Sequence, residues 1–226
     1  MIRRLVVAFA LLLNLAAPAL SKPRNWVGVV SATPQGGYLI GNPKAPVKVI
    51  EYFSLTCPHC RHFAETGIAP LKANYIANGR VSLELRNLIL NAPDLTASLL
   101  MRCTQPAKAA QLYDQIYAEQ EAVFGGTYHL SSDAVARIEA APDTQKPAVL
   151  AREGGIDKWF IAKGLAPKAV SACLADPKAQ DRLLAIRNDA VKNYDVQGTP
   201  SFIVNGKRID GVTWEDLEPA LKAAGS

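Results

Sequence analysis

The 226-residue sequence lacks the motifs that mark most nucleotide-binding and hydrolytic enzymes. It has no glycine-rich phosphate loop, no nucleophilic serine motif, no internal repeat and no low-complexity tract. Methionine-rich and histidine-rich tracts are also missing, since the chain has only 2 Met and 3 His residues. These absences argue against a P-loop enzyme, a serine hydrolase and a repeat protein.

Clusters of positive charge are missing too, although 25 Lys and Arg residues against 20 Asp and Glu residues give a net charge of +5. The longest basic runs are the pairs Arg3-Arg4 and Lys207-Arg208. Because binding to phosphates needs clustered cations, we interpret the excess charge as a solvated surface and predict no nucleic-acid partner.

Residues 1–21 have the pattern of a secretory signal peptide. Two arginines precede an apolar run from Leu5 to Ala17, and small residues follow. The alternative is a membrane anchor, but a spanning helix needs about 20 apolar residues and this run stops before Pro18. We therefore predict cleavage and export to an oxidising compartment, and no later segment has the pattern of a membrane span.

The segment after the signal peptide predicts an α/β protein. Residues 22–46 are rich in Pro and Gly, which favours an extended N-terminal arm. Residues 47–53 are a nearly continuous run of β-formers and predict a buried strand, whereas alternation over residues 81–86 predicts a half-buried one. Between the two strands we expect a helix that begins at Pro58 and is kinked near Gly67.

The second half of the chain begins with a long helical region. Residues 93–195 predict about four to six helices, separated by Pro or Gly. Residues 200–204 and 207–210 then flank Asn205-Gly206, a pair that suits the type I′ turn of a β-hairpin. A last helix is expected, with Thr213 as its N-cap.

The order of these elements predicts an α/β fold with an inserted helical domain. Residues 47–92 and 196–226 would form one discontinuous sheet domain, and residues 93–195 would be the insertion.

Two of the four cysteines lie in the sequence Cys57-Pro58-His59-Cys60, between a predicted strand and a predicted helix. That context turns a common C-x-x-C match into a redox signal. A thiol at a helix N-terminus faces unpaired N–H groups and the positive end of the helix dipole, which lower its pKa. We expect Cys57 to be the acidic, exposed nucleophile. Cys60, one turn into the helix, should be less exposed and should resolve a mixed disulfide.

His59 favours one direction of this chemistry. A protonated imidazole next to Cys57 would stabilise the thiolate, and a stabilised reduced form makes the disulfide a stronger oxidant. The motif therefore favours donation of disulfides. A structural disulfide and a zinc site are the alternatives, but zinc needs further ligands and we predict no metal site. The available candidates are His62, Cys103, His129 and Cys173.

The stretch from Val49 to Cys60, including its Pro-His dipeptide, resembles the strand and active site of the DsbA family of periplasmic disulfide oxidases. Residues 198–207 are similar to that family's cis-proline loop and hairpin. The resemblance implies a thioredoxin-like fold, a periplasmic location and no cofactor, because thiolate and disulfide carry the electrons. As partners it implies reduced, unfolded exported proteins and a quinone-linked inner-membrane reoxidase of the DsbB type. We expect the enzyme to be a monomer.

The resemblance also implies roles for three residues outside the C-x-x-C motif. Pro200 would be cis and packed against the disulfide, and Thr199 would offer backbone hydrogen bonds to a substrate peptide. An ordinary turn proline is the alternative, since X-Pro bonds are trans by default. Glu51 matches an acid that the family buries near its active site, where a raised pKa would let it accept a proton from Cys60. A solvent-facing strand residue is the alternative for Glu51.

Two departures from the family pattern keep other functions open. Thr199 stands where the best-known oxidases carry Val, and Thr is usual in disulfide isomerases. Those isomerases have an N-terminal dimerisation domain, which residues 22–46 are too short to form. A periplasmic reductase or isomerase, or a copper-binding thiol module, therefore remains an alternative. The extra pair Cys103 and Cys173 is expected to form a structural disulfide, with two buried free thiols as the alternative.

Overall fold

The computed structural model describes residues 24–226, so the predicted signal peptide at residues 1–21 lies outside the described part. The described residues form a six-stranded sheet of order β1-β2-β4-β3-β5-β6. Only β3 and β4 pair in parallel, and the other neighbouring strands are antiparallel. The strands are β1 (Val30–Ala32), β2 (Tyr38–Gly41), β3 (Val47–Phe53), β4 (Val81–Asn87), β5 (Ser201–Val204) and β6 (Lys207–Arg208).

The segment predicted as an extended arm, residues 22–46, contributes two strands to the sheet. β1 pairs with β2, and β2 pairs with β4, so the sheet begins at Val30 rather than at residue 47. The strands have only 3 and 4 residues, too few for an alternating pattern to stand out. The glycine content that suggested an arm serves the turn between them, where Gly36 has a φ of 87°.

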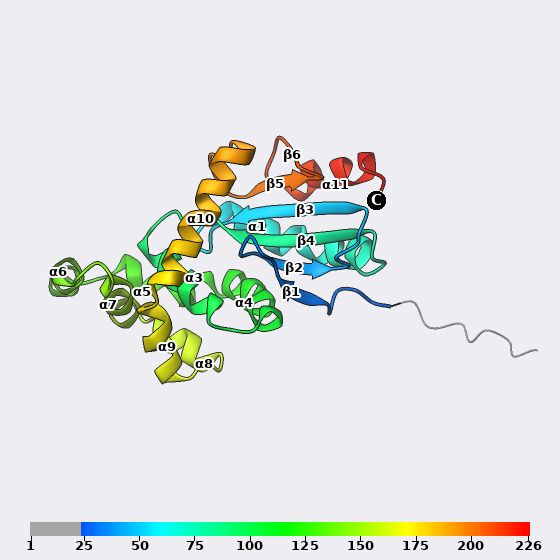
Figure 1. The fold of residues 1–226 in the computed structure, drawn as a ribbon. Helices are drawn as coiled ribbons and strands as arrows, with labels where there is room; N and C mark the ends of the chain where they lie inside the picture. The colour runs from blue at the N-terminus through cyan, green and yellow to red at the C-terminus, as the bar shows by residue number, and fades with distance from the viewer. Residues whose placement is uncertain (1–23) are drawn as a thin grey trace, which may run out of the picture.

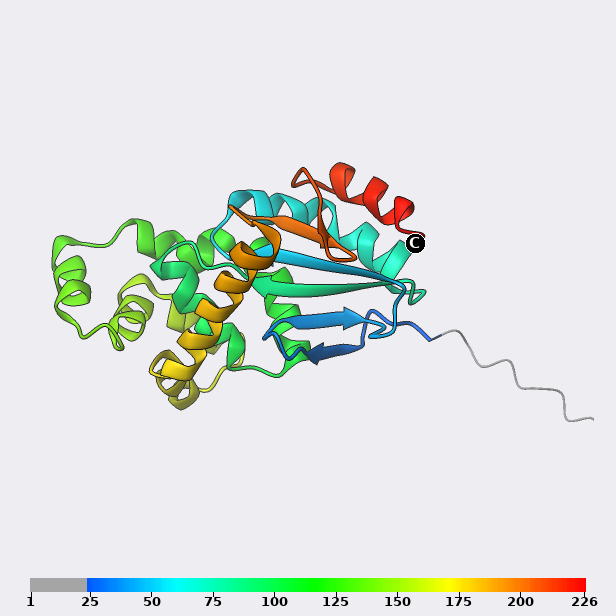
Figure 2. The same ribbon diagram turned by 45° about the horizontal axis from the view of Figure 1, so that its top comes forward.

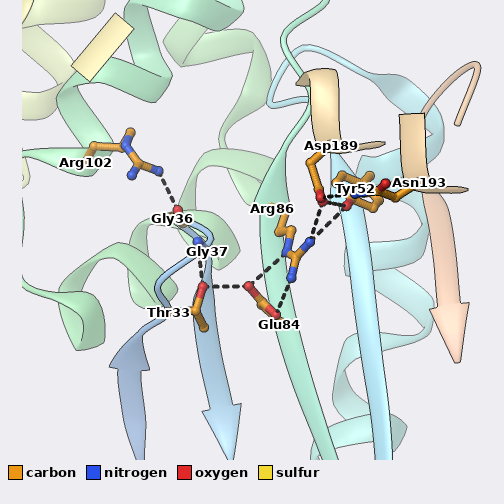
Figure 3. A network of polar contacts seen from close by, with 9 residues as sticks. All are labelled: Thr33, Gly36, Gly37, Tyr52, Glu84, Arg86, Arg102, Asp189 and Asn193. Atoms are coloured by element: carbon orange, nitrogen blue, oxygen red, sulfur yellow. Dashed lines mark hydrogen bonds and ion pairs between the residues drawn. The ribbon is translucent and has the colours of Figure 1, made fainter. Parts of the chain in front are cut away.

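The prediction that residues 81–86 form a half-buried strand is wrong, because every residue of β4 is buried. Two of its charged side chains, Glu84 and Arg86, belong to a buried polar network (Figure 3). The Arg86 guanidinium donates to Glu84 at 2.8 Å and to Asp189 of the helical insertion at 2.8 Å. Thr33 donates to Glu84 at 2.6 Å. Paired and hydrogen-bonded charges avoid most of the penalty that isolated buried charges incur.

Three helical segments follow β3 and lead to β4. They are α1 (Pro58–Thr66), α2 (Ile68–Leu71) and the π-helical turn η1 (Lys72–Ile76). The predicted break near Gly67 is confirmed, and a side chain there would collide with the ring of Phe63. Phe63 in turn packs against Phe202 of β5, with ring centroids 4.6 Å apart, so α1 covers the sheet face that carries Phe202.

The region between residues 93 and 195 contains eight helices rather than four to six. Helices α5 to α9 have only 7 to 9 residues each, so pairs of them look like single periodic stretches in the sequence. The helices α5 to α9 lie beyond the end of the sheet toward which β3 points (Figure 1). The eight are α3 (Ala92–Arg102), α4 (Pro106–Ala118), α5 (Gln120–Tyr128), α6 (Ser132–Ala140), α7 (Lys146–Gly154), α8 (Ile156–Ala162), α9 (Pro167–Leu174) and α10 (Pro177–Tyr194).

The predicted hairpin and final helix are confirmed. Asn205 and Gly206 join β5 to β6 with φ values of 49° and 84°, as a type I′ turn requires. Thr213 caps α11 (Trp214–Ala223), and Asp216 closes a capping box with it. Figure 2 shows α11, drawn in red, on the side of the sheet where β5 and the edge strand β6 lie. Within residues 24–226, no helix has the length and apolarity that a membrane span requires.

Candidate active site

Cys57 and Cys60 lie where the carboxyl end of β3 turns into α1, at the boundary between the sheet and the helical insertion. Cys57 is the N-cap residue of α1, and Pro58 occupies the first helical position, where a missing N–H has no cost. Both thiols are free. Cys57 is 6% exposed and Cys60 is 0% exposed. The predicted order of exposure is therefore observed, but Cys57 is more covered than the exposed nucleophile that we expected.

Hydrogen-bond donors around Cys57 Sγ lower the pKa of this thiol to about 5. The largest effect is donation by the Cys60 thiol, and burial acts in the opposite direction. The backbone N–H groups of Cys60 and His59 add to the lowering. A thiol with this pKa is almost fully ionised at neutral pH.

His59 lowers the pKa of Cys57 through its backbone N–H, and the additional effect of a protonated imidazole stays a prediction. The side chain of His59 is exposed, as is that of Pro58. The N-terminal position of the motif on α1 thus accounts for the contribution of His59 to the lowered pKa.

The pKa of Cys60 moves in the opposite direction and lies well above its ordinary value. Burial is the main cause, followed by the hydrogen bond to Cys57 and the charge of Glu51. The pair therefore consists of one stable thiolate and one thiol that holds its proton.

Glu51 of β3 is fully buried, and burial raises the pKa of its carboxyl group to about 8. The hydroxyl group of Tyr113, on α4, donates to both carboxylate oxygens at 2.9 and 2.8 Å, and these bonds oppose the rise. The charge of Cys57 adds to the rise in the pKa of Glu51. Sequence reasoning missed Tyr113, because nothing in its helical stretch distinguishes it from other core residues.

The loop from Thr199 to Pro200 lies beside Cys57. The Thr199–Pro200 peptide bond is cis, and the backbone oxygen of Thr199 lies 3.2 Å from Cys57 Sγ. The Thr199 hydroxyl oxygen is buried and has no hydrogen-bond partner among the described residues. Pairing of β5 with β3, in which Phe202 lies opposite Glu51, holds the loop at this position.

The loop before Cys57 is held by the helical insertion. Asp94 of α3 accepts hydrogen bonds from the Ser54 hydroxyl at 2.6 Å and from the Leu55 N–H at 3.0 Å. Gln120 of α5 donates to the backbone oxygen of Leu55 at 2.9 Å and to that of Cys57 at 3.4 Å. Sequence reasoning missed Asp94 and Gln120 too, because their role depends on contacts between segments far apart in the chain.

The second pair of cysteines lies on other elements. Cys103, at the end of α3, and Cys173, on α9, are joined by a disulfide that links residues 70 positions apart, with Cα atoms 6.1 Å apart. Among residues 24–226, no group of three or more His, Cys, Asp or Glu side chains is arranged to hold a metal ion.

Comparisons with known proteins agree with this fold. Residues 33–223 match the family model described as thioredoxin. The structure of a protein-disulfide isomerase from Novosphingobium aromaticivorans is 26% identical and superposes with a TM-score of 0.77 over 83% of this chain and 97% of that one. Alpha-DsbA1 from Wolbachia pipientis is 20% identical, with a TM-score of 0.64 over 85% and 92% of the two chains, and indicates a shared fold.

Two Rickettsia proteins provisionally named as protein-disulfide oxidoreductases are similar in sequence. The protein from Rickettsia bellii is 26% identical over 199 residues, which cover 82% of this chain. The match spans 63% of the length of that relative. The protein from Rickettsia conorii is 28% identical over 216 residues, which cover 93% of this chain and 70% of the relative.

Proposed function

Because this chain belongs to the thioredoxin family, we propose that it is a protein thiol-disulfide oxidoreductase of the DsbA type that works through Cys57 and Cys60. The predicted thioredoxin-like fold with a helical insertion is confirmed. One observation carries the functional proposal. Two neighbouring thiols have opposite pKa shifts, with Cys57 lowered to about 5 and Cys60 raised. Such a pair stabilises its reduced form and gives up its disulfide readily.

In the proposed direction, the protein oxidises a dithiol. A substrate thiolate attacks Cys57 Sγ, the bond to Cys60 breaks, and the electron pair leaves on Cys60 Sγ. Glu51, whose pKa of about 8 keeps it largely protonated at neutral pH, supplies the proton that Cys60 takes up. A second substrate thiolate then attacks the substrate sulfur of the mixed disulfide, and Cys57 leaves as its stable thiolate. The substrate disulfide is released, and Glu51 regains a proton from solvent.

We propose reduced, unfolded exported proteins as the substrates and the periplasm as the location. The cis-proline loop supports this choice, because the backbone of Thr199 lies next to Cys57 Sγ and can bond an extended peptide whose cysteine reaches that atom. The electrons stay on sulfur, so the cycle needs no bound cofactor. The reduced pair would be returned to the disulfide by a DsbB-type membrane partner. The proposed enzyme acts as a monomer.

A reductase or isomerase is the second candidate. The presence of Thr199 before Pro200 favours it, as does the similarity to a structure named as a protein-disulfide isomerase. In that case the dithiol form would be the active one, and the Cys57 thiolate would attack disulfides in the substrate.

The redox potential of the Cys57–Cys60 pair distinguishes these functions. It would be measured by equilibration with glutathione in the mature protein carrying Cys103→Ser and Cys173→Ser, so that only one pair reports. We expect a value near about −120 mV, as in strongly oxidising DsbA. A value near about −270 mV, as in thioredoxin, would contradict the oxidase direction. A Cys57→Ser variant that retained full activity would contradict thiol exchange altogether.

A further inference from the structure

A cavity of about 350 Å³ lies where the turn between β1 and β2 meets the ends of α3 and α9. Its wall includes both half-cystines of the Cys103–Cys173 disulfide, together with Arg102 and Arg182. None of residues 54–60 or 199–200 lines it. The cavity is therefore separate from the thiol site at Cys57.

The wall of this cavity carries an excess of positive charge. The Arg102 guanidinium donates to the backbone oxygen of Gly36 at 2.7 Å. Burial lowers the pKa of Arg102, Tyr38 opposes this change, and the nearby charge of Arg182 adds to the lowering. Among residues 24–226, no carboxylate forms an ion pair with Arg102. The Arg182 guanidinium lies 3.6 Å from the carboxylate of Asp176, which also lines the wall. The Arg182 side chain is 56% exposed. Two cations thus face one anion, and a negatively charged ligand would relieve their repulsion.

The disulfide between Cys103 and Cys173 forms part of the cavity wall. Cys103 and Cys173 are both partly exposed, and they lie at helix ends rather than inside the core. Neighbouring cations attract an anionic thiolate and stabilise the cysteine thiolate that leaves when a disulfide is broken. The surroundings of this disulfide therefore favour reaction with thiols that carry a negative charge.

We propose that the cavity binds a small anionic thiol and that the bound thiolate reduces the Cys103–Cys173 disulfide. The thiolate forms a bond to one cysteine sulfur, the sulfur–sulfur bond breaks, and the electron pair leaves on the other cysteine. A second molecule of the thiol attacks the resulting mixed disulfide and is released joined to the first. Two small thiols are oxidised to one disulfide, and the cysteine pair gains two electrons and two protons.

The test uses the mature protein carrying Cys57→Ser and Cys60→Ser, in which only the second pair can react. Its reduction would be followed by alkylation and mass spectrometry with three reductants: 2-mercaptoethanesulfonate, neutral 2-mercaptoethanol and cationic cysteamine. Rates are compared per concentration of thiolate. We expect the anion to be fastest and the cation slowest, with the differences shrinking at about 1 M salt, where charges are screened beyond about 3 Å. Equal rates for the three thiols would overturn the proposal.

Arg182→Gln in the same background tests the cavity itself. We expect it to lower the rate ratio of anionic to neutral thiol about three- to tenfold. Arg187→Gln is the matched control, because Arg187 is exposed on the same helix and lies outside the cavity wall. The rate with the neutral thiol reports any loosening of the fold. If Arg182→Gln and Arg187→Gln change the ratio equally, the cavity does not select the thiol and the proposal fails.

Discussion

The two cysteine pairs of this protein each bring two sulfur atoms together, but in opposite surroundings. Cys57 and Cys60 are three positions apart at a helix N-terminus, are buried, and have free thiols. Cys103 and Cys173 are 70 residues apart, lie at the ends of two short helices, and are bonded to each other. The first pair is surrounded by hydrogen-bond donors, whereas the second borders a cavity with two guanidinium groups.

This difference shows that the surroundings, rather than the cysteines, determine what a pair can do. In the first pair, donors act on one sulfur and burial acts on the other, which separates their pKa values. In the second pair, the disulfide closes a long loop within the helical insertion and stabilises it. The first pair is therefore suited to exchange with protein substrates, whereas the second stabilises the insertion and borders the cavity proposed to bind small anionic thiols.

The largest expected effect is on oxidase activity, when serine replaces cysteine in one pair or in the other. Cys57→Ser should abolish oxidation of a reduced, unfolded protein, because no other thiol has a stabilised thiolate. The Cys103→Ser, Cys173→Ser variant should retain most of that activity. Disulfide formation in the substrate, measured by alkylation of its remaining thiols, reports both. Comparable losses of activity in the two variants would remove the distinction between the pairs.

The same variants should differ in stability in the reverse order. Loss of the disulfide between Cys103 and Cys173 should lower the free energy of unfolding by about 4 kcal/mol, as the chain-entropy model gives for a loop of this length. Urea unfolding of the Cys57→Ser, Cys60→Ser variant, in which the Cys103–Cys173 disulfide stays intact, provides the control, and the change there should be much smaller. A disulfide-free insertion that unfolds at the same urea concentration as the parent would contradict a structural role.

Tyr113→Phe should have a smaller effect, on the pH dependence of mixed-disulfide formation by Cys57 and Cys60. The hydroxyl group stabilises the ionised form of Glu51, so its removal should raise the pKa of this acid above about 8. Because protonated Glu51 supplies a proton to Cys60, the rate of mixed-disulfide formation should fall as pH rises through that pKa. The fall should therefore shift to higher pH in Tyr113→Phe.

Glu51→Gln identifies the titrating group in this experiment. This substitution should remove the change in rate near pH 8 and slow mixed-disulfide formation by at least about tenfold. The lower limit is below the usual range for acid catalysis because water can also protonate the Cys60 thiolate. The pH profile would be measured by stopped-flow mixing with a peptide dithiol. An unchanged profile in both variants would exclude Glu51 and Tyr113 from the step.

The sequence predicted those features of the fold and the site that depend only on residues close together in the chain. The Cys57 to Cys60 spacing, the Asn205-Gly206 turn and the Thr213 cap each depend on a few neighbouring residues. Tyr113 could not be predicted, because its partner Glu51 is 62 residues away and the contact depends on how α4 packs on the sheet. The burial of Glu84 depends in the same way on Asp189 and Arg86, which complete the network on another face of the sheet.

The pKa of Cys57 tests the central claim most directly, namely that its surroundings make it a stable thiolate. It would be measured from the pH dependence of alkylation of reduced Cys57 in the variant carrying Cys103→Ser and Cys173→Ser, with thiolate absorbance as an independent signal. The account predicts a transition near pH 5. A transition near the ordinary pKa of a free cysteine, about 8.5, would contradict it.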